Sequence, residues 1–179
     1  ILGRVAASWF TYDTQRPDES VVANLGDPGH RWLNASGAYN GNRAEMTIKT
    51  ASGGIFDTPT EITRGQDGTM IVTFDDCTTG TVEYDIPSIG WSGTVPIQRV
   101  ANDNVVLCEA ISGQIAIEQQ NVLKDQSANH TLSSDIPVPD AGAPLLVDMN
   151  PGLNDAWYYP ETDGQGFFIT VFPDLGRVV

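Results

Sequence analysis

The sequence predicts an all-β protein: an antiparallel β-sandwich or up-and-down barrel of about eight to ten short strands, with a Pro/Asp-rich linker. Three observations support this prediction. Gly (18 residues) and Pro (11 residues) are frequent and mark many turns. Thr, Val and Ile are plentiful, whereas helix formers are scarce in most segments, a mix that favours strands. The turns recur at short intervals, which indicates antiparallel neighbours rather than strands joined by crossover helices.

The first half of the chain alternates predicted strands with polar turns. The clearest strand has Ala44, Met46 and Ile48 on one face and polar residues between them, a period of two that is typical of a half-buried strand. The strands expected here are Arg4–Asp13, Arg31–Ala35, Arg43–Thr50, Glu61–Arg64 and Thr69–Asp76. The turns expected between and after them are Ser36–Asn42, Gly65–Gly68 and Cys77–Gly80.

The second half contains further strands and a change of composition. Pro96 within a strand indicates an edge or a bulge. The strands expected are Thr81–Ile86, Thr94–Val100, Ile111–Ile117, Asn154–Pro160 and Phe167–Phe172, with turns at Glu161–Gly166 and Pro173–Gly176. The polar stretch Gln119–Pro144 resembles an extended linker, and Gln119–Asp125 is the one place where a short helix is expected. We therefore divide the chain into a main β-domain (1–117), a linker (118–150) and a terminal strand pair (151–179) that completes the same or a neighbouring domain.

The two cysteines, Cys77 and Cys108, indicate the compartment. The chain has no C-x-x-C motif and no His/Cys cluster, which argues against a zinc site. A single pair in an acidic, Lys-poor, β-rich chain predicts a disulfide and an extracellular or cell-surface location. Such a bond stabilises the fold by about 3–4 kcal/mol in the chain-entropy model. The alternative is two buried free thiols.

The net charge of −14 limits the partners of this chain. A general nucleic-acid binder needs cations to neutralise phosphates, and this chain has few. The same charge argues against docking on anionic membranes. No run of about 18 apolar residues is present, so membrane insertion is not expected.

Catalytic chemistry has little support in the sequence, and we expect no enzyme and no catalytic residues. Neither His30 nor His130 is flanked by a nucleophile-elbow motif. Glu83 and Asp85 share one strand face, but a solvated face explains them equally well. No cofactor is expected apart from Ca²⁺, for which the candidate ligands are Asp67, Asp103 and Asp163. None of them has EF-hand spacing, and ordinary turn chemistry also accounts for them.

The two ends of the chain match each other. The run LGRV occurs at Leu2–Val5 and again at Leu175–Val178. A further copy placed after Val179 would create a strand, a tight turn and a strand, which is a well-formed hairpin. The chain therefore has the pattern of one period of a tandem array opened at a hairpin tip. A four-residue match also arises by chance.

Several motifs together resemble a known kind of module. The run Trp157–Phe168 (WYYPETDGQGFF) is similar to the W-Y-x-P-x-x-x-G-Q-G-F motif of uncharacterised modules in secreted bacterial proteins. In those modules the motif is followed by a hairpin, by a strand similar to Trp9–Asp13, by an R-W-L segment (here Arg31–Leu33) and by F-x-D-C-x-x-G-T (here Phe74–Thr81). The resemblance implies a module and a compartment but no activity. This chain departs from the family in order, because its W-Y-x-P strands come last.

The expected function is that of a structural subunit or repeat unit of an extracellular bacterial filament or surface assembly. An unpaired FFITVF strand would be a severe edge liability, so it must pair with a sheet of the same chain or of another copy. The expected partner is another copy of this chain, and head-to-tail strand addition would build a filament. The assembly strand expected is Phe167, Phe168, Ile169, Thr170, Val171 and Phe172, and its partner strand contains Val5, Trp9, Phe10 and Tyr12.

The alternative function is a secreted carbohydrate- or surface-ligand-binding module. The candidate residues for a binding face are Trp9, Trp32, Trp91 and Trp157, although tryptophans in a small β-domain belong more often to the core. Two or more of them on one exposed patch would support this alternative.

Overall fold

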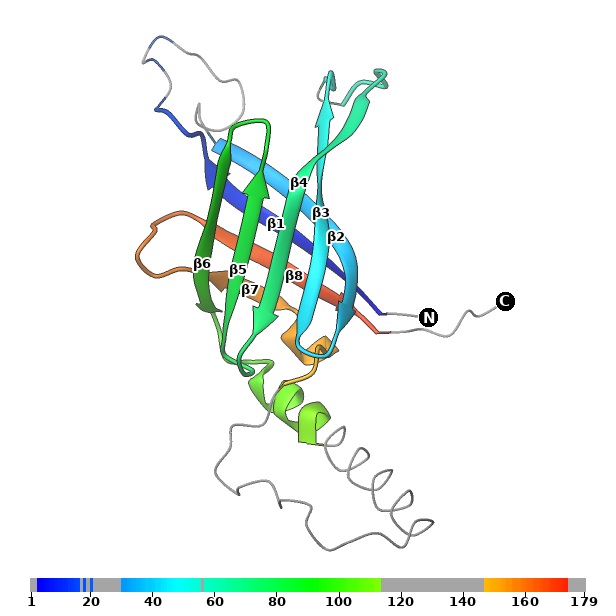
Figure 1. Ribbon diagram of the computed structural model, residues 1–179, viewed down its shortest axis with the longest axis vertical. Helices are drawn as coiled ribbons and strands as arrows, with labels where there is room; N and C mark the ends of the chain where they lie inside the picture. The colour runs from blue at the N-terminus through cyan, green and yellow to red at the C-terminus, as the bar shows by residue number, and fades with distance from the viewer. Residues whose placement is uncertain are drawn as a thin grey trace, which may run out of the picture.

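The computed structural model is an all-β protein in which eight antiparallel strands form one closed barrel (Figure 1). The structure describes residues 3–16, 18, 20, 30–55, 57–113 and 147–173. Each strand pairs with the next along the chain, so the topology is an up-and-down barrel and the sandwich alternative is not observed. The strands are β1 (Arg4–Tyr12), β2 (His30–Asn40), β3 (Arg43–Ser52), β4 (Thr63–Phe74), β5 (Thr79–Ile86), β6 (Trp91–Arg99), β7 (Asp155–Tyr158) and β8 (Gly166–Phe172).

Side chains at every second strand position fill the middle of the barrel. In β3 the three predicted core residues Ala44, Met46 and Ile48 are all buried, and the residues between them face outward. Other buried apolar residues are Val5, Ala7, Met70, Val72, Phe74, Val82, Ile97, Ile169 and Val171. The interior is therefore a packed core and not a channel, as an eight-stranded barrel allows.

Two expected turns lie inside strands. Ser36–Asn40 continues β2, and the chain reverses only at Gly41 and Asn42 between the paired residues Asn40 and Arg43. Gly41 has φ 58°, a value that favours glycine, so local turn chemistry selects this position.

The predicted turn Gly65–Gly68 is part of β4. Its register against β3 shifts between Thr47 and Lys49, and Gly68 has φ 86° at this bulge. Glycine and aspartate therefore occur here at a β-bulge. A β-bulge and a turn favour the same residue types, which is why the sequence predicted a turn.

The terminal strand pair closes the barrel within one chain. β8 pairs with β1 over seven residue pairs, from Arg4↔Phe172 to Phe10↔Gly166, and with β7 over three. Figure 1 shows β1 in blue and β8 in red running side by side. The expected turn Pro173–Gly176 lies largely outside the described residues, as does the expected helix Gln119–Asp125.

One end of the barrel is covered by a helix and by the disulfide. Cys77, in the β4–β5 turn, is bonded to Cys108, so the predicted disulfide is confirmed. Cys108 lies in a helix over residues 105–113, below the barrel in Figure 1. The strand predicted at Ile111–Ile117 is therefore wrong for its described part, because residues 111–113 belong to this helix, which the Cys77–Cys108 bond attaches to the closed end of the barrel.

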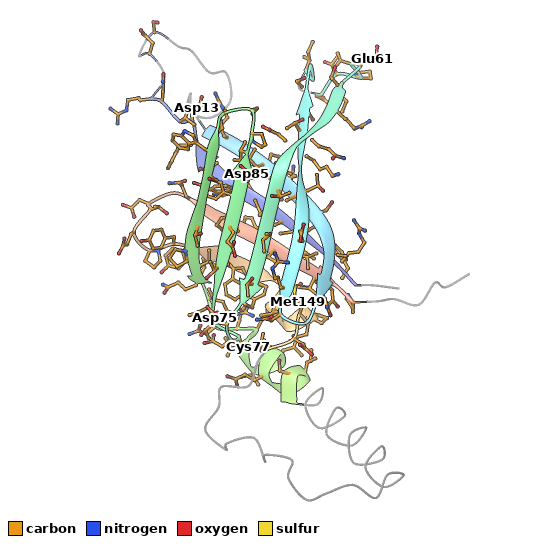
Figure 2. All side chains as sticks on the ribbon, viewed as in Figure 1. Asp13, Glu61, Asp75, Cys77, Asp85 and Met149 are labelled. Carbon is orange, nitrogen blue, oxygen red and sulfur yellow. A yellow bond between two sulfur atoms is a disulfide. The ribbon has the colours of Figure 1, made fainter. Side chains whose placement is uncertain are left out.

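The segment just before β7 also covers this end. Val147, Met149 and Asn150 are buried, although we placed them in the linker. Figure 2 shows Met149 close to this end of the barrel, as are Asp75 and Cys77. Asn150 caps the short 3₁₀ helix η1 (Pro151–Leu153) by accepting a hydrogen bond from the backbone of Gly152 (2.9 Å). A Cβ at Gly152 would lie 2.4 Å from the Cys108 backbone, so glycine permits close packing here.

A buried arginine connects the parts of this closed end. Arg99 is 5% exposed and donates to the Cys77 carbonyl, to the Gly152 carbonyl (2.5 Å) and to Asp155 Oδ2 (2.5 Å). Its guanidinium also lies 4.6 Å from the centre of the Trp157 ring. The arginine thus joins β6 to the disulfide turn, to η1 and to β7.

The other end of the barrel is open, because β2 and β3 diverge there. Their ladder ends at Asn34↔Lys49. Beyond this pair β2 continues along β1 to His30, whereas β3 continues along β4 to Ser52. The β3–β4 hairpin consequently extends beyond the rim (Figure 1).

Within the described residues, no helix has the length and apolar character that crossing a membrane requires.

Candidate functional site

The candidate site is a cavity of about 330 Å³ in the open mouth of the barrel. Its floor is aromatic. The Trp9 ring stacks on Phe167 with ring centres 5.2 Å apart, and it packs against Tyr84 with centres 5.0 Å apart. Trp9 is 8% exposed, so these rings separate the cavity from the packed core below. Such a volume is near the lower end of the range for small-molecule sites.

The rim carries two exposed tryptophans from opposite sides of the mouth. Trp91 begins β6 and is 50% exposed, and Trp32 in β2 is 63% exposed. Ile86 and Leu33 provide apolar surface beside them. The cavity therefore offers flat aromatic surfaces on its floor and its rim.

Polar side chains at the mouth form pairs with each other. Arg31 forms an ion pair with Asp13, which Figure 2 places at the upper end. Asp67 accepts hydrogen bonds from the backbone nitrogen (3.1 Å) and hydroxyl of Ser88.

A further polar pair spans the β1–β8 side of the mouth. Thr11 Oγ1 donates to Gln165 Oε1 (2.6 Å), and Gln165, which lines the cavity, also has an amide nitrogen that can donate to a ligand. With one arginine and two carboxylates in these pairs, the mouth suits a small ligand with apolar faces and a polar edge.

A second hollow adjoins the mouth on the outside of the barrel. It has a volume of about 670 Å³ and lies where β2 and β3 diverge. Trp32 and Leu33 line both hollows. Lys49 and Arg64 line only the outer one, which we call the β2–β4 groove because β2, β3 and β4 form it.

The strands expected to mediate assembly pair with each other in one chain. Val5 lies opposite Val171 and Trp9 lies opposite Phe167, with the side chains of all four buried. Phe168 and Phe172 face outward, as does Phe10. Tyr12 lies beyond the β8 ladder, opposite His30 of β2.

The three candidate calcium ligands are not brought together. Asp67 lies at the mouth in β4, Asp103 precedes the helix at the closed end, and Asp163 lies between β7 and β8. In the part of the chain that the structure describes, no three His, Cys, Asp or Glu side chains form a group able to hold a metal. Asp67 instead holds the Ser88 turn.

The tryptophans divide between core and site. Trp157 is fully buried against Phe74 at the closed end, and Trp9 is the cavity floor. Trp32 and Trp91 meet the criterion of two exposed tryptophans at one hollow. Sequence reasoning missed Tyr84, Arg31 and Gln165 as site residues, although strand alternation placed Tyr84 on the same face as Val82.

Comparisons with known proteins give no match: no model of a protein family, no curated protein and no solved structure resembles this chain at a significant level.

Proposed function

We propose that this protein is an extracellular binding module that holds a saccharide in the mouth of its barrel. The observation that carries the proposal is the aromatic cavity with polar pairs at its edge. The C–H faces of a sugar ring carry partial positive charge and stack on the negative face of an indole or phenol ring. Sugar hydroxyls form hydrogen bonds with groups such as the Gln165 amide and the Asp67 carboxylate. The disulfide supports the proposed location, because such bonds persist in oxidising compartments.

The first prediction concerns Trp91. We expect a neutral trisaccharide such as cellotriose or maltotriose to quench tryptophan fluorescence, and we expect Trp91→Ala to weaken its binding about tenfold by removing one ring contact. Calorimetry with the same sugars measures the dissociation constants. Trp91 is half-exposed, so the variant should fold normally.

Phe172→Ala is the matched control for this experiment. Phe172 is also an exposed aromatic residue, but it pairs with Arg4 at the far end of β1. The Phe172→Ala variant should bind the sugar with the same affinity as the wild type. The proposal fails if no sugar of a panel of hexose, pentose and uronic-acid oligosaccharides binds, or if Trp91→Ala binds as tightly as wild type.

As a second candidate function, we propose that copies assemble by exchanging the β1–β8 pairing, which makes the protein a subunit of a surface assembly. The supporting observation is that these terminal strands pair edge to edge over seven residue pairs, contacts that two copies can form equally well. Exchange requires this seam to open, because β8 is paired with both β1 and β7. Electron microscopy and light scattering of the native material test this proposal, and a strictly monodisperse monomer would contradict it.

A further inference from the structure

The β2–β4 groove is a positive surface on a strongly negative protein. The chain has 9 Lys and Arg residues against 23 Asp and Glu residues. Two of these cations, Lys49 and Arg64, line the groove, and its lining contains no Asp or Glu. The ion pairs of the described residues use Arg31, Arg43 and Arg99, so Lys49 and Arg64 have no carboxylate partner there.

The strand register places both cations on the outer face of the barrel. Lys49 follows the buried Ile48 and points outward, opposite Asn34 of β2. Arg64 lies opposite Ala51, two residues further along β3. Because β2 has left β3 at this point, the cations border an open hollow and not a continuous sheet surface.

Trp32 lines both the β2–β4 groove and the mouth, and contacts with neighbouring side chains fix the orientation of its ring. Its ring stacks on Phe10 with centres 5.8 Å apart and an angle of 17° between the planes. Its indole nitrogen donates to Asn34 Oδ1 (3.1 Å), and Ser8 Oγ donates to the same oxygen (2.8 Å). Side chains therefore position this ring in advance, and it remains 63% exposed.

We propose that the ligand is an acidic oligosaccharide that spans both hollows. This inference rests on the proposed function. One sugar ring occupies the mouth, the chain passes Trp32, and the carboxylate of a uronic acid unit lies between Lys49 and Arg64. The continuity of the two hollows through Trp32 and Leu33 allows one ligand to reach both. The repulsion that a −14 protein exerts on an anionic ligand makes this pair of cations necessary for such binding.

Calorimetry with two trisaccharides of the same length tests the inference: a uronic-acid trisaccharide and a neutral hexose trisaccharide. We expect the wild type to bind the acidic sugar between about twofold and thirtyfold more tightly, as two exposed ion pairs imply. About 0.5 M NaCl should remove most of this preference, because the Debye length then falls to about 4 Å. The salt should leave the neutral sugar nearly unaffected.

The double variant Lys49→Gln/Arg64→Gln should lose the preference and keep the wild-type affinity for the neutral sugar. Arg43→Gln is the matched control, since it removes one exposed cation from the same strand at the other end of β3 and should retain the preference. If the neutral sugar binds but the acidic one binds no better, the groove proposal is wrong and the mouth proposal stands. If neither sugar binds, both proposals are wrong. A preference that survives in the double variant also overturns the role of the groove.

Discussion

Asp76 shows how a single side chain organises the turn that carries the disulfide. Its Oδ1 accepts hydrogen bonds from the backbone nitrogens of Thr78 (2.6 Å) and Thr79 (2.8 Å) and from the Thr78 hydroxyl (2.6 Å). Burial raises the pKa of this carboxyl, but the hydrogen bonds from Thr78 and Thr79 together outweigh burial, so its pKa lies below the ordinary value. The sequence predicted a turn here, and this acceptor is the physical reason for it.

The second prediction follows from that pKa. Because the pKa of Asp76 is lower in the folded chain, its stabilising effect is complete above the unfolded pKa of about 3.9 and is lost as the pH falls through the folded pKa. We expect Asp76→Ala to cost about 1 kcal/mol of unfolding free energy at neutral pH. The cost should diminish once the carboxyl is protonated in the folded state. Urea unfolding over a pH series measures it, with Asp76→Asn, which keeps an acceptor, as the milder variant.

The third prediction concerns Arg99, which connects four parts of the closed end. Arg99→Met leaves Asp155 and the carbonyls of Cys77 and Gly152 without their donor, so we expect a loss of about 3–5 kcal/mol in unfolding free energy. Arg43→Met removes an exposed ion pair and should change stability by less than about 0.5 kcal/mol. Equal effects of the two substitutions in denaturant titrations would contradict the role of Arg99.

At the scale of elements, the sequence predicted which segments form strands but did not predict where each strand begins and ends. β1, β3, β5, β7 and β8 lie within a few residues of their predicted positions. β2 and β4 are longer than predicted, because Ser36–Asn40 and Gly65–Gly68 have turn-like composition and yet pair with neighbours. Pairing across the barrel overrides local preference in both cases.

The fourth prediction concerns Gly37, which lies in the turn-like part of β2. A Cβ at Gly37 would lie 1.8 Å from the Glu45 carbonyl oxygen in the adjacent strand β3. Gly37→Ala should therefore force β2 and β3 apart and cost about 2–3 kcal/mol. Gly54→Ala, where the nearest side chain would be an ordinary 3.7 Å away, should stay within about 0.5 kcal/mol. Thermal unfolding monitored by circular dichroism distinguishes the two variants.

At the scale of the whole molecule, the barrel has one closed and one open end. The disulfide, the helix over residues 105–113 and η1 cover one end, while divergence of β2 from β3 opens the other. The candidate site therefore lies as far as the fold allows from the most strongly cross-linked region. Substitutions at the mouth should affect binding more than stability.

The fifth prediction uses the β1–β8 seam. Because Arg4 lies directly opposite Phe172, a permutant that joins Val179 to Ile1 and opens between Ser133 and Ser134 should form the same barrel with the Cys77–Cys108 bond intact. This permutant places β7 and β8 before β1 in the chain. Its circular dichroism spectrum and disulfide content should match those of the parent chain, and loss of cooperative unfolding would contradict the prediction.

The permutant also tests assembly. Its β8 and β1 form a covalent hairpin, so the two strands can no longer separate into different copies. If the parent chain forms oligomers by exchanging this seam, the permutant should remain a monomer in light scattering.

The sequence by itself determined the all-β class, the alternating core of β3 and the strand character of both chain ends, because these depend on composition and on a period of two along one strand. It predicted the disulfide from the single cysteine pair, and the structure confirmed the bond. Only the tertiary structure decided that the barrel closes within one chain, that residues 105–113 form a helix, and that Trp32 and Trp91 face one hollow while Trp157 is buried. The closure of the barrel and the positions of the tryptophans depend on the register between strands distant in the sequence, whereas the helix lies where the Cys77–Cys108 bond attaches it to the closed end. Local preference carries no information about that register, and packing of the whole barrel selects it.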